Sequence, residues 1–133
     1  MPQDYFRQPG ADVSTPALSA SWEQFDNATV IHLTGDLDMA TVGRAEQALE
    51  DAVQDTTSSL ILDLSGITFF ASTGLHLLVR LKAATCDQDQ NLHVVAAHRR
   101  VLRPLQLTEL DAAFEIHPTV EHALTAALRP PAP

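Results

Sequence analysis

The sequence has few of the residues on which several classes of protein depend. It contains one cysteine, Cys86, among 133 residues, which excludes an internal disulfide and any site built from several thiolates. Aromatic residues make up only 5%, so the core must be built from Leu, Val, Ile and Ala. No apolar run approaches the roughly 20 residues of a membrane-spanning helix, and no secretory signal is visible. We therefore expect a cytoplasmic protein without a membrane span.

Basic residues are also scarce. Lys and Arg number 8 against 17 Asp and Glu, which gives a formal net charge of −9. A nucleic-acid-binding protein usually carries a concentrated basic surface, and the one basic cluster here, Arg99, Arg100 and Arg103, is short. The composition argues against direct binding of DNA or RNA and favours a partner with a basic face.

The rest of the composition is that of one globular domain. An apolar share of 45% in a chain of 133 residues is typical of a single hydrophobic core. Prolines gather near both ends of the chain. The sequence therefore predicts a flexible N-terminal tail at residues 1–17, one domain at residues 18–128, and a flexible Pro-rich tail at residues 129–133.

Strand and helix patterns alternate along the domain. Alternating and β-branched segments predict strands at residues 18–24, 29–34, 60–64, 91–96 and 113–116. Apolar residues at helical spacing predict helices at residues 42–53, 72–86, 99–107 and 120–128. Thr119 is expected to cap the last of these helices. This order predicts an α/β fold, with a mixed sheet of four to five strands and helices packed against it.

The segments that follow the predicted strands at 29–34 and 60–64 suggest a functional site. After the strand at 29–34, Asp38 is expected to cap the next helix. After the strand at 60–64, residues 67–70 are expected to turn back towards the core, and the Ser72 hydroxyl is expected to cap the helix at 72–86. A polar stripe should run along that helix, comprising Ser72, Thr73, His76, Arg80, Ala83 and Asp87. The opposite arc of the helix, which includes Val79, should be buried.

Ser72 has two interpretations from its position alone. A helix N-terminus favours negative charge, so a phosphate on Ser72 would be tolerated there and would repel a partner from an acidic surface. Alternatively, Ser72 is only an N-cap, worth about 1 kcal/mol.

Three segments in this order resemble the STAS domain family, and within it the anti-sigma factor antagonists: residues 30–38, 60–64 and 69–75. Later segments resemble the end of the same domain: residues 104–111, 114–116 and 120–124. The resemblance covers about residues 18–128, nearly the whole predicted domain, and implies a STAS-like fold.

The resemblance implies a partner switch. Such an antagonist binds an anti-sigma factor that is also a serine kinase of the GHKL ATPase type, and so releases a sigma factor for transcription. The kinase phosphorylates the antagonist, which separates the two proteins, and a PP2C-type phosphatase reverses this. The implied phosphorylation site is Ser72. With the polar stripe, the expected partner-binding residues are Gly35, Asp36, Asp38, Ala71, Ser72, Thr73, Gly74, His76 and Arg80.

Ala71 departs from the family pattern, which usually has Asp immediately before the phosphorylated serine. This departure leaves open a non-phosphorylated STAS scaffold, a small-ligand sensor or a subunit of a lipid-transport complex. A serine hydrolase is an alternative from another class, but Ser72 lacks a G-x-S-x-G elbow and a visible base and acid. The six histidines show no metal-ligand spacing. We therefore expect no enzymatic activity, no cofactor and no metal site.

Overall fold

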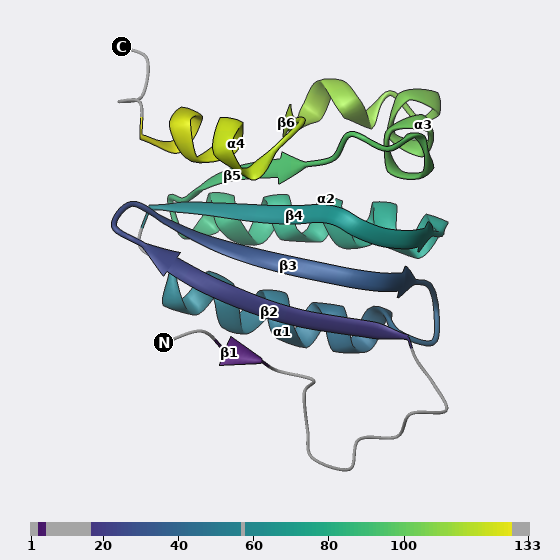
Figure 1. Cartoon of the computed structure of the whole chain (residues 1–133), viewed down its shortest axis with the longest axis horizontal. Coiled ribbons are helices and arrows are strands. Elements are labelled where there is room, and N and C mark those ends of the chain that lie inside the picture. The colour runs from purple at the N-terminus through teal and green to yellow at the C-terminus, as the bar shows by residue number, and fades with distance from the viewer. Residues whose placement is uncertain (1–2, 5–16, 57, 129–133) are drawn as a thin grey trace.

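The computed structural model describes residues 3–4, 17–56 and 58–128, whose arrangement is shown in Figure 1. The strands are β1 (Gln3–Asp4), β2 (Leu18–Phe25), β3 (Ala28–Leu37), β4 (Ser59–Phe70), β5 (Asn91–Val95) and β6 (Glu115–His117). The helices are α1 (Val42–Asp55), α2 (Ser72–Asp87), α3 (Arg99–Leu107) and α4 (Val120–Ala127), with a short 3₁₀ helix, η1 (Leu110–Ala113). In this part of the chain, no helix has the length and apolar character needed to cross a membrane. The predicted tails at residues 1–17 and 129–133 lie outside the described residues, except for β1 and Ala17.

The strands form one mixed sheet in the order β1-β2-β3-β4-β5-β6. β2 is antiparallel to both β1 and β3, whereas β3, β4, β5 and β6 run parallel to one another. The predicted α/β fold with a mixed sheet is confirmed. β1 adds a short strand from the segment predicted as a tail, where Gln3 pairs with Trp22. A segment of two residues is too short to show the alternation of apolar and polar residues that predicts a strand. β1 is therefore recognised only by its pairing with β2.

Helices cover the two faces of the sheet unequally (Figure 1). α1, α2 and α3 pack on one face and enclose the main apolar core. α4 packs on the other face over a smaller cluster: Ala28, Val30, Ile61, Val95 and Ala123. Side chains alternate between the faces along a strand. His32, Asp63 and His93 each lie two residues from a member of that cluster, so they share the α4 face.

β4 is longer than the sequence pattern predicts. The prediction ended this strand at Leu64 and turned residues 67–70 back towards the core, but the strand continues beside β3 to its end at the corner. Two register shifts, one of them between Gly35 and Asp36 of β3, each leave one extra residue in β4, and the two strands stay paired beyond Gly66. β3 and β4 therefore end side by side.

The C-terminal elements differ from the prediction by a few residues. The strand predicted at residues 113–116 lies instead at Glu115–His117, because the backbone is left-handed at Glu109 (φ 60°) and then winds into η1 before it reaches the sheet. Thr119 caps α4 as predicted, since its hydroxyl accepts a hydrogen bond from the His122 N–H (3.1 Å).

Candidate functional site

The corner between β4 and α2 is bonded to the end of β3. The Ala71 N–H donates a hydrogen bond to the Leu37 carbonyl (3.0 Å). Ala71 has an extended backbone (φ −91°, ψ 175°) and occupies the N-cap position of α2. Gly74 is buried in the first turn of α2, where its N–H donates to the Ala71 carbonyl (2.8 Å). The predicted corner residues therefore lie together at the end of the sheet where both strands finish.

Ser72 begins α2 as its first residue and is not its cap. The prediction that its hydroxyl caps the helix is wrong, because the N-cap residue is Ala71, which has no polar side chain. The Ser72 side chain is exposed and forms no hydrogen bond with the described residues. Without a side-chain cap, backbone N–H groups of the first turn stay available to an anion. The position thus combines an accessible hydroxyl with an environment that tolerates negative charge.

The end of β3, at Gly35 and Asp36, is attached to its surroundings on two sides. Gly35 has φ +112°, and a Cβ there would collide with the Ala17 carbonyl, so the position requires glycine. The Asp36 N–H donates to the same carbonyl (2.8 Å). On the other side, the Thr68 hydroxyl of β4 donates to the Asp36 carboxylate (2.8 Å). These bonds fix the end of β3 beside the corner.

Asp38 shapes the turn that leads into α1. Its carboxylate accepts hydrogen bonds from the N–H groups of Ala40 (2.9 Å) and Thr41 (3.2 Å). The N-cap residue of α1 is Thr41, so the prediction that Asp38 caps this helix is wrong. The Asp38 carboxylate instead accepts hydrogen bonds from the turn that precedes α1.

Two large apolar side chains project from the same edge. Met39, in the loop after β3, is 83% exposed, and Phe69, next to the end of β4, is 53% exposed. Exposed apolar groups that gather at one place indicate an interaction site. The exposed and half-exposed side chains of this edge are termed the corner surface: Asp36, Asp38, Met39, Phe69, Ser72 and His76. Met39 and Phe69 were not among the predicted site residues, although alternation along a strand predicts that one residue of a Phe-Phe pair faces outwards.

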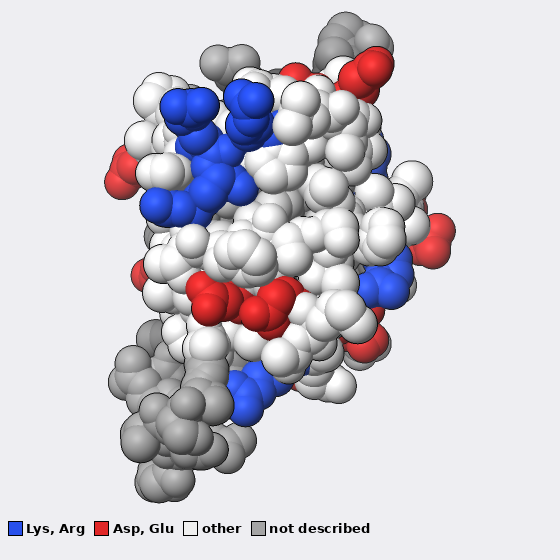
Figure 2. All heavy atoms as spheres, turned by 90° about the vertical axis from the view of Figure 1, so that its right-hand side faces the viewer, with Lys and Arg blue, Asp and Glu red and all other residues white. Residues whose placement is uncertain are grey.

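Charge is unevenly distributed around the corner surface (Figure 2). A group of acidic side chains lies near the middle of this end of the molecule, and a basic patch lies over α3. The arginines of α3 are Arg99, Arg100 and Arg103, all exposed. Arg100 Nη1 donates to the Ile67 carbonyl of β4 (3.4 Å), which places the start of α3 beside the strand that ends at the corner. A basic patch therefore lies beside the corner surface, although the protein as a whole is acidic.

The predicted polar stripe of α2 divides into two parts. Ser72 and His76 are exposed near the start of the helix. Arg80 lies eight residues after Ser72, about 12 Å along the helix axis. Its guanidinium forms an ion pair with Glu46 of α1 (2.5 Å). Val79, predicted to be buried, is 46% exposed, because only one side of α2 faces the core. The structure therefore separates Arg80 from the corner surface.

A polar network lies outside the corner surface, on the α4 face of the sheet. His32 Nδ1 is 2.6 Å from Asp63 Oδ2, and His32 Nε2 is 3.2 Å from Glu23 Oε1. The Ser65 N–H and hydroxyl donate to the second Asp63 oxygen (2.9 and 2.6 Å). The hydrogen bond to Asp63 raises the pKa of His32 against the effect of burial. Burial alone would raise the pKa of Asp63, but hydrogen bonds from His32 and Ser65 lower it. Both shifts favour a charged pair that joins β3 to β4.

A second cluster on the same face joins β5 to β6 and consists of His93, Glu115 and His117. Their nitrogen and oxygen atoms are close enough to hold a metal ion. The prediction of no metal site did not anticipate this group, because spacing along the chain does not reveal residues that meet across strands. The parallel register, in which His93 pairs with Glu115, brings together residues from different strands.

Comparison with known proteins identifies the fold and the family. The profile of the STAS domain matches residues 19–123. The chain belongs to the STAS domain family. This STAS domain is 33% identical over 112 residues to the anti-sigma-F factor antagonist RsfB of Mycobacterium tuberculosis, an alignment that covers 82% of this chain and 88% of that protein. It is 28% identical over 91 residues to the anti-sigma-B factor antagonist of Staphylococcus aureus, covering 68% of this chain and 84% of that protein.

A solved structure shows the same arrangement. The crystal structure of an anti-sigma factor antagonist from Mycobacterium paratuberculosis, 33% identical, superposes with a TM-score of 0.80 and covers 88% of this STAS domain chain and 100% of that chain. The predicted STAS fold and the resemblance to anti-sigma factor antagonists are both confirmed.

Proposed function

We propose that this STAS domain is an anti-sigma factor antagonist, which binds an anti-sigma factor through the corner surface and thereby frees a sigma factor. The observation that carries this proposal is the exposure of Met39 and Phe69 near Ser72, at the end of the sheet where β3 and β4 finish. The Ser72 hydroxyl has no hydrogen-bond partner among the described residues. The similarity to proteins named as antagonists supports it. The role is one of binding without catalysis, exercised in the cytoplasm, where transcription takes place.

The corner surface has the composition of a small protein interface. A few large apolar side chains usually supply most of the binding energy, and polar groups surround them. Met39 and Phe69 serve as the apolar anchors, and Asp36 and Asp38 form part of the polar rim. A complementary partner would offer an apolar groove, basic groups opposite the two aspartates and acidic groups opposite the arginines of α3.

We propose that phosphorylation of Ser72 controls this binding. The kinase would be the anti-sigma factor itself, of the GHKL type, and a PP2C-type phosphatase would reverse the reaction. The exposed hydroxyl is accessible to a kinase, and the start of α2 tolerates a phosphate without unfolding. A phosphate would add nearly two negative charges next to Asp36 and Asp38. It would oppose docking by repulsion and by the cost of desolvating the charge.

Ala71 supports one alternative, a STAS scaffold that binds its partner without phosphorylation. The N-cap position carries no carboxylate that could orient Ser72 or engage the metal-nucleotide site of a kinase. In that case the corner surface would bind in the same way, and Ser72 would remain unmodified.

Binding can be tested by calorimetry with purified anti-sigma factors of the same organism. Phe69→Ala and Met39→Ala should each weaken binding by at least about tenfold, because each removes a central apolar anchor. Val79→Ala is the matched control, since it removes an exposed apolar side chain of α2 outside the corner surface. If Val79→Ala weakens binding and the two corner variants do not, the interface lies elsewhere.

Phosphorylation needs a separate experiment. The protein is incubated with the bound anti-sigma factor and Mg-ATP, and its peptides are analysed by mass spectrometry. Phosphate on Ser72, absent from Ser72→Ala, supports the switch, and Ser72→Glu should then lose affinity for the anti-sigma factor. Binding without any phosphate on Ser72 supports the scaffold instead.

A further inference from the structure

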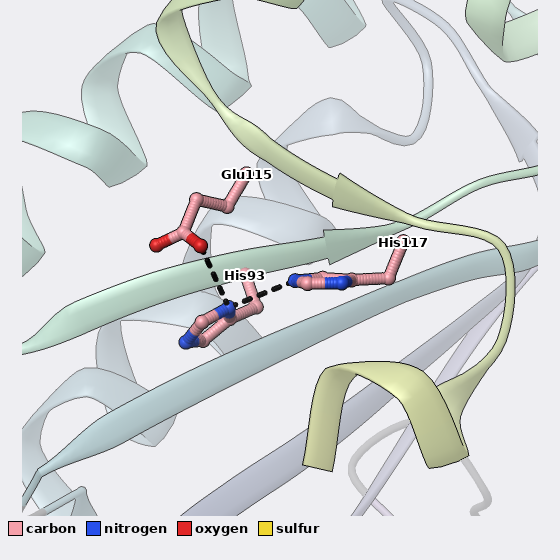
Figure 3. A group of neighbouring side chains, drawn as sticks. All are labelled: His93, Glu115 and His117. Carbon is pink, nitrogen blue, oxygen red and sulfur yellow. Dashed lines mark hydrogen bonds and ion pairs between the residues drawn. The ribbon is translucent and has the colours of Figure 1, made fainter. Parts of the chain in front are cut away.

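The cluster on β5 and β6 gathers three metal-binding side chains. In the parallel pair, His93 lies opposite Glu115, and Val95 lies opposite His117. Residues 115 and 117 share one face of β6 because side chains alternate along a strand. Figure 3 shows the three side chains pointing towards one another from the two neighbouring strands. They lie on the face that α4 covers, and none belongs to the corner surface.

The distances are close to those of a metal site. His93 Nδ1 is 3.0 Å from His117 Nε2 and 4.0 Å from Glu115 Oε1, and the three atoms lie within 4.8 Å of one another. Zinc binds imidazole nitrogen at about 2.0–2.1 Å, so two nitrogens in a tetrahedral site are about 3.3 Å apart. The two imidazoles need to move apart by only a few tenths of an ångström. The Glu115 side chain is 67% exposed and is free to rotate inwards.

The state of His93 favours coordination. Its side chain is only 4% exposed, and burial lowers its pKa below the usual histidine value, although Glu115 opposes this effect. A neutral imidazole keeps a lone pair for a metal ion, whereas a protonated one does not. The backbone of β5 also holds His93 within the sheet, so little order has to be created on binding.

The donor atoms indicate the class of metal. Two imidazoles and one carboxylate form a set that zinc uses in proteins, commonly with a fourth position open to solvent. Calcium and magnesium prefer sites made entirely of oxygen, and no thiolate is present to select a softer ion.

We propose that His93, Glu115 and His117 form a binding site for a divalent transition metal of the zinc type, with one coordination position open to solvent. The ion would join β5 to β6, which is only three residues long. A hydrogen bond between the two imidazoles is the simpler alternative for the 3.0 Å contact, but it gives no role to Glu115.

The test uses full-length protein treated with a chelator, which is then removed, and isothermal titration with ZnCl₂. One Zn²⁺ should bind per chain, and the melting temperature should rise with the free zinc concentration, because the ion binds the folded state. His117→Gln and Glu115→Gln should each weaken binding by more than about tenfold, because losing even a residue that only hydrogen-bonds to a metal ligand weakens binding by about 10–100-fold. Both residues are accessible to solvent, so these variants keep the fold even if the buried His93→Gln does not.

The matched control is His98→Asn, which removes an exposed imidazole but leaves a good N-cap for α3. Its zinc affinity should equal that of the unmodified protein. Co²⁺ gives a second measurement, since its visible absorption reports the ligands directly, and His117→Gln should change that spectrum. Absence of saturable one-to-one binding would leave only the imidazole hydrogen bond. Equal losses in His98→Asn and His117→Gln would mean that zinc binds scattered surface histidines. Either result overturns the proposal.

Discussion

The ring of Phe70 occupies the space that a side chain at Gly74 would need. A Cβ at Gly74 would lie 2.6 Å from Phe70 Cε1, and the Phe70 side chain is itself buried in the main core. The last residue of β4 thus packs against the first turn of α2, and the absence of a side chain at residue 74 allows the helix to start so close to the strand.

Gly74→Ala should therefore destabilise the protein. Because the Phe70 ring cannot move without disturbing the core, we expect a loss of about 1–3 kcal/mol in the free energy of unfolding, measured by urea denaturation. Gly43→Ala is the matched control. A Cβ at Gly43 in α1 meets nothing within 4 Å, so alanine should stabilise the helix by up to about 1 kcal/mol. Equal effects of the two substitutions would contradict this packing.

Thr73→Val should stabilise the protein. The Thr73 hydroxyl oxygen is buried without a hydrogen-bond partner among the described residues, which typically costs about 1–3 kcal/mol. Valine has nearly the same shape and should recover about 1 kcal/mol in urea denaturation. Thr85→Val is the control in the same helix, because the Thr85 hydroxyl donates to the Lys82 carbonyl (3.0 Å). That substitution should destabilise. A loss of stability in Thr73→Val would mean that the hydroxyl has a partner after all.

The His32–Asp63 pair predicts a pH dependence of stability. The raised pKa of His32 means that its contribution is complete below its usual value of 6.5 and is lost as the pH rises through the folded value. The lowered pKa of Asp63 means that its contribution is present above its usual value of 3.8 and is lost as the pH falls through the folded value. The pair should contribute most between these two values.

Urea denaturation over a series of pH values tests this dependence. The stability advantage of the unmodified protein over His32→Gln should shrink as the pH rises above neutrality. His76→Gln, which removes an exposed imidazole of α2, should follow the unmodified protein throughout. Parallel pH curves for the unmodified protein and His32→Gln would show that the pair contributes nothing.

Arg80→Ala tests how far the binding face extends along α2. The exposed ion pair with Glu46 should contribute only about 0.2–1 kcal/mol to stability. If Arg80 serves chiefly to join α2 to α1, affinity for the anti-sigma factor should stay unchanged, whereas His76→Asp near Ser72 should weaken it. The opposite result, a loss of affinity in Arg80→Ala but not in His76→Asp, would show that the partner binds over the Arg80–Glu46 ion pair between α2 and α1.

The sequence predicted the elements whose signals are local. α1 and α2 follow from helical spacing, and Thr119 caps α4 because a hydroxyl before a helix acts within one turn. Features that depend on pairing between distant residues were not predictable in this way. The second half of β4 is a strand because β3 lies beside it, and Gly66 suggests a turn when considered alone.

The candidate site was also predictable only in part. The order of the sequence motifs, including Ser72 and the segment at Gly35, predicted where along the chain the site lies. The exposure of Met39 and Phe69 depends on which way a loop and a strand end face, which composition does not fix. His93 and His117 are 24 residues apart in the chain, and only the register of β5 and β6 brings them into contact.

The shortness of β6 limits how this protein can associate with others. An unpaired edge strand invites another chain to extend the sheet, and a short strand ended by proline discourages this. β6 spans three residues and is followed directly by Pro118. At this edge, strand addition and edge-to-edge aggregation are therefore disfavoured. A partner that contacts this edge must therefore do so through side chains rather than by adding a strand to the sheet.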